Sequence, residues 1–251
     1  PIEAKYGLTR TQLFEAYQRA REMGVKRFGL HTMVISAELR TEAFLLTARI
    51  MFELAAELKA RLGIHVEFIN LGGGFGIPYR PEEKPVNYTA IGAGVQRLYN
   101  HILRPVGLSD VGIRTESGRA ITGDAGWLVS TVLHKKDTYK HYIGLDSCMA
   151  NLMRPALYGA YHHITVLGKE GAPADHVYDV TGSLCENNDK FAIDRALPEI
   201  AIGDIVIIHD TGAHGSAMGF NYNGKLHCAE LLRRTDGTIE LIRRAQTIDD
   251  Y

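Results

Sequence analysis

Hydrophobic and polar residues in the first half of the chain alternate between helix-like and strand-like spacing. Three stretches have the period of an amphipathic helix and are predicted helices, the first with Thr9 as a candidate N-cap: 9–23, roughly 38–62, and 88–104. Three short apolar runs between them are predicted strands: 27–34, 65–71 and 111–116. Strands that alternate with helices predict a parallel sheet with right-handed crossovers.

The second half has a different pattern. Residues 127–150 and 176–247 carry short β-branched runs separated by Gly, Asn and Asp, which predicts antiparallel strands. The predicted fold class is therefore α/β followed by β. We place the domain boundary near residue 126, which gives domains of residues 1–126 and 127–251.

Composition narrows the class of protein. The chain has 251 residues, 45% hydrophobic and 23% charged, which is typical of a soluble globular protein. A net charge of -1 leaves no broad basic field, so neither a nucleic-acid nor a membrane partner is expected. Cys148, Cys185 and Cys228 are scattered and odd in number, which argues against disulfides and zinc and favours a reducing, cytoplasmic compartment. The chain starts at Pro1 without a methionine, and we expect it to be a piece of a longer protein.

Two stretches at predicted strand ends carry candidate chemistry. After the second strand comes Gly72-Gly73-Gly74, at the edge where α/β folds bind ligands and where glycine lets backbone N–H groups face an anion. A phosphate site and a plain tight turn are both open from the residues alone. After the third strand, Glu116 and Arg119 flank Gly118 and could hold a cationic and an anionic group, or could form a surface ion pair.

Five motifs then occur in one order: "NLGGGFGIPY", "ESGRAITGDAG", "DSCMANLMRPALYGAYH", "GSLCENNDKFA" and "DTGAHGSAMGFNYN". Together they resemble the pyridoxal-phosphate decarboxylases of the alanine-racemase-like fold, in particular the diaminopimelate decarboxylases. The resemblance covers nearly the whole chain. It implies pyridoxal 5'-phosphate as cofactor, the latter part of a (β/α)8 barrel followed by a C-terminal β-barrel or β-sandwich domain, and a homodimer with composite active sites.

The resemblance also implies roles for individual residues. Cofactor contacts would come from the glycine turn, Glu116, Gly118, Arg119 and Tyr222, with Gly74 nearest the phosphate and Glu116 at the pyridine nitrogen. A carboxylate there favours decarboxylation, because it keeps the ring a good electron acceptor. Cys185 would be the catalytic acid and would reach the neighbouring subunit's barrel together with Glu186. The following residues would contact the substrate: Arg119, Arg154, Tyr158, Glu186 and Tyr222.

Several positions depart from the family pattern. Met33 stands where the family has a histidine stacked on the cofactor, Ser117 replaces a proline, and His214 replaces a tyrosine beside the active site. The lysine that binds the cofactor covalently is not found in its usual motif. Only about three parallel strands are predicted where such a barrel has eight, so we expect the missing strands and the lysine upstream of Pro1.

Three interpretations of the function remain. The first is decarboxylation of meso-diaminopimelate to L-lysine. The second is decarboxylation of another basic amino acid (ornithine, lysine, arginine or carboxynorspermidine). The third is a catalytically silent relative that binds a partner protein, which Met33 favours. No metal is predicted: the adjacent His162 and His163 lack ligand spacing, and we expect them on a solvated helical face.

Overall fold

The computed structural model describes residues 3–251, which form two compact units. One unit comprises the residues up to Pro78 together with Lys84–Ala120, and the other comprises Tyr79–Glu83 together with Ile121–Tyr251. The main division lies between residues 120 and 121, close to the change in pattern near residue 126.

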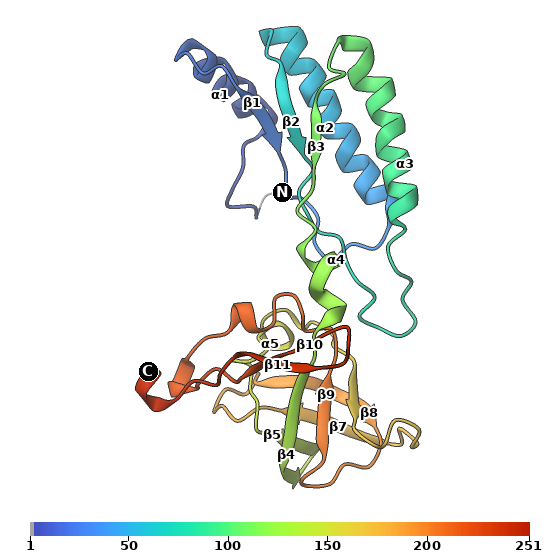
Figure 1. The fold of residues 1–251 in the computed structure, drawn as a ribbon, viewed down its shortest axis with the longest axis vertical. Coiled ribbons are helices and arrows are strands. Elements are labelled where there is room, and N and C mark those ends of the chain that lie inside the picture. Colours follow the sequence, from blue (N-terminus) through green and yellow to red (C-terminus); the bar gives the residue numbers. More distant parts are fainter. Residues whose placement is uncertain (1–2) are drawn as a thin grey trace. The chain divides into compact units, whose positions relative to one another are not determined.

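The first unit is a three-stranded sheet with helices between its strands (Figure 1). Its strands, in the order β1-β2-β3, are β1 (Phe28–His31), β2 (Val66–Asn70) and β3 (Gly112–Arg114). Its helices are α1 (Arg10–Glu22), α2 (Thr41–Leu62) and α3 (Tyr88–Leu98). Both strand pairs are parallel, which confirms the arrangement predicted from the alternation of strands and helices.

Local sequence explains where these helices start and stop. Thr9 caps α1 in a capping box with Gln12, which satisfies N–H groups that the first turn leaves unpaired. Gly63 ends α2 in the left-handed conformation, at φ 65°. One face of α2 packs into the core beside β2, with Phe52 and Leu58 fully buried. Burial of such side chains contributes roughly 1.5–3 kcal/mol each.

Two helix ends differ from the predicted ones because of contacts distant in sequence. Helix α2 begins at Thr41 rather than near residue 38, because Glu38 is extended and bridges to Phe75. Helix α3 ends at Leu98, and the chain continues as a π-helical turn (Tyr99–Leu103) and a 3-10 turn (Arg104–Val106). Periodicity alone does not distinguish these tighter and wider turns from α-helix.

The second unit contains a six-stranded mixed sheet in the order β6-β9-β4-β5-β7-β8. Its strands are β4 (Leu128–Asp137), β5 (His141–Leu145), β6 (Ile164–Val166), β7 (His176–Thr181), β8 (Lys190–Leu197) and β9 (Ile205–Ile208). A separate two-stranded sheet pairs β10 (Glu230–Arg233) with β11 (Ile239–Arg243). Helix α4 (Gly118–Thr122) contains the division between the units, and α5 (Arg154–Tyr158) lies within the second unit. The second unit also has 3-10 turns at Gly123–Ala125, Ser216–Met218, Tyr222–Gly224 and Ile248–Asp250.

The strand pattern of this unit is nearly the predicted one. Most pairs are antiparallel, but β5 and β7 run parallel, because the connection between them carries α5 and β6 before the chain returns. Side chains that alternate inward along the strands build the core, among them Ile143, Val180 and Ile208, all fully buried. Within residues 3–251, no helix is long and apolar enough to cross a membrane.

Candidate active site

The glycine turn after β2 is pressed between two other segments of backbone. Gly72 and Gly74 have φ of +73° and +84°, a region that favours glycine. A methyl group on Gly72, Gly73 or Gly74 would overlap the carbonyl oxygen of Thr32, Glu116 or Ile35 respectively. Close backbone packing therefore explains the three glycines without any ligand.

The N–H groups of this turn have different partners. The Gly72 N–H donates to Asn70 Oδ1 at 3.0 Å, and the Gly73 N–H lies 3.3 Å from the Met33 sulfur. Among the described residues, the Gly74 N–H has no hydrogen-bond partner, and Gly74 is partly exposed. The Gly74 N–H is thus the candidate contact of this turn to an anion such as a phosphate. The Met33 side chain therefore contacts the turn directly, although the family pattern has a histidine at this position.

Three polar side chains meet beside the turn, one from each strand end. Asn70 Nδ2 donates to Glu116 Oε1 at 2.7 Å, and His31 Nε2 lies 3.4 Å from the same oxygen. The side chains of His31 and Glu116 are about half exposed, at 52% and 53%. Carboxyl ends of parallel strands lie at one edge of the sheet, so these residues are brought together. Sequence reasoning identified Glu116 but missed Asn70, whose only signal is that it ends a predicted strand.

Gly118 and Arg119 open α4, the short helix that follows Glu116. A methyl group built on Gly118 would have no other atom within 4 Å, so packing does not require glycine at this position. Arg119 is partly buried. The structure therefore leaves space beside Gly118, which is compatible with its predicted role at a cofactor.

A second polar group, in the other unit, surrounds Cys185. The Tyr222 hydroxyl donates to Glu186 Oε1 at 2.7 Å, and this hydrogen bond raises the pKa of Tyr222. Asn223 Nδ2 donates to the Cys185 sulfur at 3.3 Å. Cys185, Glu186 and Tyr222 were predicted together from the resemblance, and the structure brings them together. Asn223 was missed, although its motif, "FNYN", was recognised.

A buried carboxylate shapes the turn that carries Cys185. Asp189 is 3% exposed and accepts hydrogen bonds from the Met149 N–H at 2.6 Å and the Leu184 N–H at 2.8 Å. Burial raises the pKa of Asp189, against the effect of these two hydrogen bonds. A side chain at Gly182 would overlap this carboxylate. Asp189 is therefore a structural anchor for the turn rather than an exposed acid.

Arg154 and Tyr158 form the two ends of α5, so the predicted helical turn is present. Arg154 is only 6% exposed, and its guanidinium lies 4.6 Å from the Tyr79 ring. Arg154 Nη1 lies 2.8 Å from His162 Nε2. Tyr158, in contrast, is 65% exposed. The pair shares a helical turn, but the arginine is buried and the tyrosine faces outward.

The prediction that His162 and His163 lie on a solvated helical face was wrong. Neither lies in a helix, and His162 is fully buried, with Nδ1 2.8 Å from the His209 carbonyl oxygen. His163 is partly buried, and burial lowers its pKa. Sequence alone could not show that Arg154 packs on His162. Within the described chain, no group of three or more His, Cys, Asp or Glu residues could hold a metal ion. His214 lies in the left-handed region, at φ 57°.

Comparison with known proteins shows which protein family this chain belongs to. Residues 32–212 match the family model of the pyridoxal-dependent decarboxylases, C-terminal sheet domain. The chain belongs to this family, as its motifs predicted. Several of its relatives and solved structural neighbours in that family are diaminopimelate decarboxylases.

Three relatives show the extent of the similarity. Protein TabA of Pseudomonas amygdali pv. tabaci is 43% identical over 249 residues, which is 99% of this chain and 58% of that protein. Diaminopimelate decarboxylase of Methanothermobacter thermautotrophicus is 35% identical over 98% of this chain and 58% of its own length. The crystal structure of the M. jannaschii diaminopimelate decarboxylase in complex with L-lysine superposes with a TM-score of 0.88 at 31% identity, covering 99% of this chain and 57% of that one. The chain thus spans less than two thirds of each relative.

Proposed function

We propose that the complete protein is a pyridoxal-phosphate-dependent decarboxylase that converts meso-diaminopimelate to L-lysine and CO2. The observation that carries this proposal is the Glu116 carboxylate, held by Asn70 beside a glycine turn at the carboxyl edge of a parallel sheet. Family membership and the L-lysine complex of a related enzyme support it. We further propose that residues 1–126 are the latter part of a (β/α)8 barrel and that residues 127–251 are the C-terminal β domain.

The first unit fits the proposed cofactor. The Gly74 N–H would donate to the phosphate, and Arg119, on the helix that follows β3, would contribute positive charge near it. Glu116 would hold a proton on the pyridine nitrogen through charge attraction. Bound pyridoxal phosphate supplies an acceptor for the electron pair left when the bond between the α-carbon and its carboxylate breaks. The strands and the lysine that complete such a site are proposed to lie in a portion outside this chain.

The second unit supplies the proposed proton donor and substrate contacts. Loss of CO2 leaves the α-carbon one proton short, and Cys185 would deliver that proton. Glu186 would pair with the distal amine of the substrate, while Arg154 and Tyr158 would bind its distal carboxylate. Tyr222 would contact the cofactor and, through its hydrogen bond, hold Glu186 in place.

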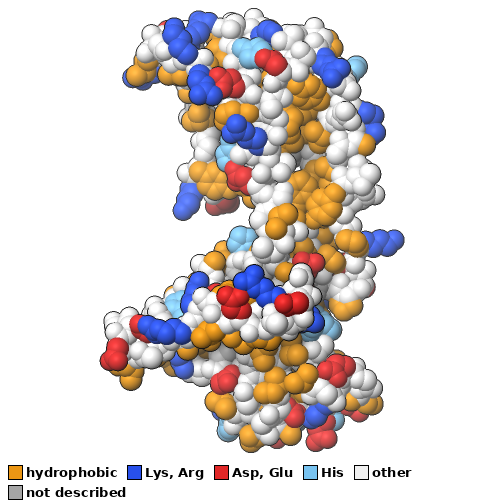
Figure 2. All heavy atoms as spheres, in the orientation of Figure 1, with side chains coloured by type: hydrophobic (Ala, Val, Ile, Leu, Met, Phe, Trp, Pro, Cys, Tyr) orange, Lys and Arg blue, Asp and Glu red, His pale blue; other side chains and the backbone are white. Residues whose placement is uncertain are grey.

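A homodimer with composite active sites is also proposed, in which Cys185 and Glu186 act in the neighbouring subunit's barrel. Several large hydrophobic side chains are exposed on the β10–β11 hairpin, among them Leu231 at 63% and Leu241 at 58%. Hydrophobic side chains are visible on the surface of both units in Figure 2. Exposed apolar surface of this kind is typical of protein interfaces, and a second copy of the chain is the proposed occupant.

A different amino-acid substrate is the second candidate. The relative with 43% identity is named TabA rather than diaminopimelate decarboxylase, and His214 replaces a tyrosine next to the active site of the family. Met33, which replaces the family's histidine, is the argument for a catalytically silent relative that binds a partner protein. Retention of Glu116, Arg119, Cys185, Glu186 and Tyr222 supports an active enzyme.

Substrate preference tests the proposal in the full-length protein. We expect kcat/KM for meso-diaminopimelate to exceed that for lysine or ornithine by about a hundredfold, because those substrates lack the distal carboxylate that Arg154 would bind. Arg154→Met should remove most of that preference. Arg195→Met is the matched control, because Arg195 Nη1 also contacts His162, at its carbonyl oxygen, but is not a proposed substrate residue. Turnover of ornithine equal to that of diaminopimelate in the parent would contradict the proposed substrate, and absence of any turnover would favour the silent relative.

A further inference from the structure

The loop of residues 221–225 holds the turn that carries Cys185 through three consecutive contacts. Tyr222 donates to Glu186, and Asn223 donates to the Cys185 sulfur. Lys225 Nζ donates to Ser183 Oγ at 2.8 Å. Three of the five loop residues thus contact the segment 183–186, and their partners follow in reverse order along the chain. The orientation of the Cys185 thiol therefore depends on the position of this loop.

The loop does not hold its shape through regular secondary structure. It forms one 3-10 turn, Tyr222–Gly224, in which Asn223 adopts the left-handed conformation at φ 53° and ψ 32°. Tyr222 is 44% exposed. Asparagine is one of the few non-glycine residues that visit this region readily, so the backbone conformation of Asn223 does not by itself fix the loop. Contacts from outside the loop must therefore set its position.

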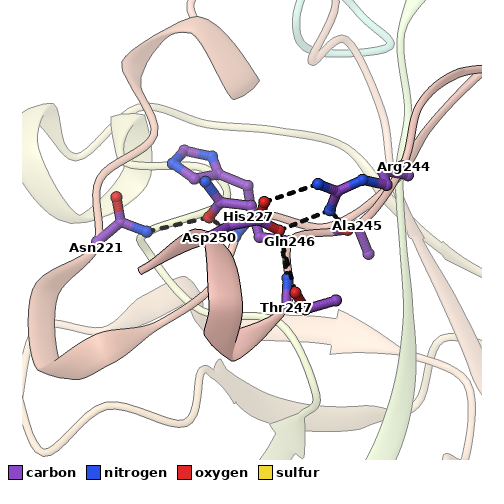
Figure 3. A network of polar contacts seen from close by, with 7 residues as sticks. All are labelled: Asn221, His227, Arg244, Ala245, Gln246, Thr247 and Asp250. Carbon is purple, nitrogen blue, oxygen red and sulfur yellow. Dashed lines mark hydrogen bonds and ion pairs between the residues drawn. The ribbon is translucent and has the colours of Figure 1, made fainter.

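The C-terminal segment provides such contacts through one side chain, as Figure 3 shows. Gln246 Oε1 accepts hydrogen bonds from the His227 N–H at 2.8 Å and from Asn221 Nδ2 at 3.2 Å. The Gln246 N–H in turn donates to the His227 carbonyl oxygen at 3.0 Å. Asn221 Nδ2 also closes the loop on itself by donating to the Lys225 carbonyl at 2.7 Å. Gln246 therefore joins Asn221, at the start of the loop, to His227, two residues after its end.

The segment around Gln246 is itself held by an ion pair. Arg244 donates from Nη1 and Nη2 to the two oxygens of Asp250, at 2.6 and 2.7 Å. The Thr247 N–H donates to the same carboxylate at 2.8 Å. A two-point arginine–carboxylate contact has a defined geometry. It fixes the backbone on both sides of Gln246.

We propose that Gln246 is a positioning residue that fixes the 221–225 loop and, through Asn223, orients the thiol of Cys185. The importance of that thiol rests on the proposed function, but the positioning itself does not. Gln246 acts through the loop and contacts neither Cys185 nor Glu186 in the structure.

The experiment compares Gln246→Ala with Gln246→Glu and Arg234→Ala in the full-length protein. A glutamate keeps an oxygen that can accept both hydrogen bonds. Among residues 3–251, the Arg234 side chain pairs only with the exposed Glu240 of the same hairpin. The first measurement is the rate of Cys185 alkylation by iodoacetamide, followed peptide by peptide with buried Cys148 as an internal reference. Since alkylation follows thiol access, we expect a rise of about threefold in Gln246→Ala and little change in the other two variants.

The second measurement is kcat/KM with meso-diaminopimelate. We expect a loss of about tenfold in Gln246→Ala and rescue in Gln246→Glu, because two hydrogen bonds are lost and then restored. If Gln246→Ala is poorly folded, Asn223→Gly provides the test instead. Glycine tolerates the left-handed backbone but lacks the contact to sulfur, so the rate of Cys185 alkylation should also rise about threefold. The proposal is overturned if Cys185 is alkylated in both Gln246→Ala and Asn223→Gly at the same rate as in Arg234→Ala. It is also overturned if Gln246→Ala and Gln246→Glu have equal effects. A parent without decarboxylase activity would refute the proposed function alone, because the alkylation rates still test the positioning.

Discussion

Gly74 shows how one residue can serve both packing and binding. Its left-handed backbone and the nearby Ile35 carbonyl exclude any side chain, and its N–H is available to a ligand. The sequence could predict that glycine was required at this turn. It could not distinguish the close backbone approach from a phosphate contact, because both demand the same residue.

We expect Gly74→Ala to abolish cofactor binding in the full-length protein, measured as the visible absorbance of bound pyridoxal phosphate. The added methyl group would displace the turn and its N–H from the phosphate. Gly92→Ala is the matched control, because a methyl group at that helical position meets no atom within 4 Å. Normal cofactor occupancy in Gly74→Ala would refute the assignment of the turn.

Cys185 and Cys228 are both exposed, so they allow a controlled test of the proposed acid. Cys185→Ala should retain the cofactor absorbance and lose at least about a hundredfold in the rate of lysine formation, in line with the loss of a general acid. Cys228→Ala should form lysine at the parent rate. The assignment fails if both variants match the parent.

The missed residues have a common physical reason. Asn70 and Asn223 contact Glu116 and Cys185 across long stretches of chain, and an asparagine at a strand end or in a turn is unremarkable in sequence. His162 was mispredicted because its burial depends on packing against Arg154 and Tyr79. Motif order led to predictions for groups that contact cofactor or substrate, but not for the side chains that hold those groups.

At the scale of elements, hydrophobic periodicity predicted the helices and parallel strands of the first unit well. It failed mainly at ends and pairings that distant residues decide, such as the bridge from Glu38 to Phe75 and the parallel pair β5–β7. The sequence of a short strand does not specify whether its neighbour runs parallel or antiparallel to it. Strand existence was therefore more predictable than sheet topology.

A buried charge on β7 joins this strand to β8 and to the turn that precedes β5. Asp179 on β7 is 1% exposed and is contacted by Lys140 at 2.8 Å and Lys190 at 3.0 Å. Burial raises the pKa of Asp179, but the hydrogen bonds from Lys140, the Asp194 N–H and Lys190 outweigh it, and the pKa is lowered overall. The ionised form is thus favoured by folding.

This charge makes the second unit sensitive to acid. A lowered pKa contributes stability above the unfolded value, roughly 3.9, and that stability is lost as the pH falls below it. We expect Asp179→Asn to lower the free energy of unfolding by about 2 kcal/mol at pH 7, because both lysines lose a buried partner. The difference from the parent should shrink towards pH 3 in urea unfolding. Asp175→Asn, at an exposed pair with His176, is the control, and a constant difference across this pH range would contradict the explanation.

At the scale of the whole molecule, self-association can be tested on the β10–β11 hairpin. Leu231 and Leu241 are paired across the two strands, so they lie on one face. If a second copy covers that face, Leu231→Glu with Leu241→Glu should convert a dimer to a monomer in sedimentation analysis of the full-length protein. Ile202→Glu, at a similarly exposed turn, should leave the dimer intact. A dimer in both variants would exclude this face as the interface.

The change in sequence pattern predicted a boundary near residue 126 but did not indicate that the five-residue segment Tyr79–Glu83 belongs to the second unit. It lies in the first half of the chain and packs within the second unit, where Tyr79 meets His162 and the Arg80 guanidinium lies over the Tyr161 ring at 4.1 Å. No local feature of these residues signals where they pack.

That segment limits how the protein can be divided and recombined. A fragment that starts at residue 121 would lack Tyr79 and Arg80 and would expose the rings of His162 and Tyr161 that they contact. A hybrid that exchanges the sheet unit between two relatives at a single crossover would combine the segment of one parent with the rings of the other. Mutual compatibility of Tyr79–Glu83 with residues 154–163 is therefore a selection criterion for such hybrids, and one that the position of the domain boundary does not reveal.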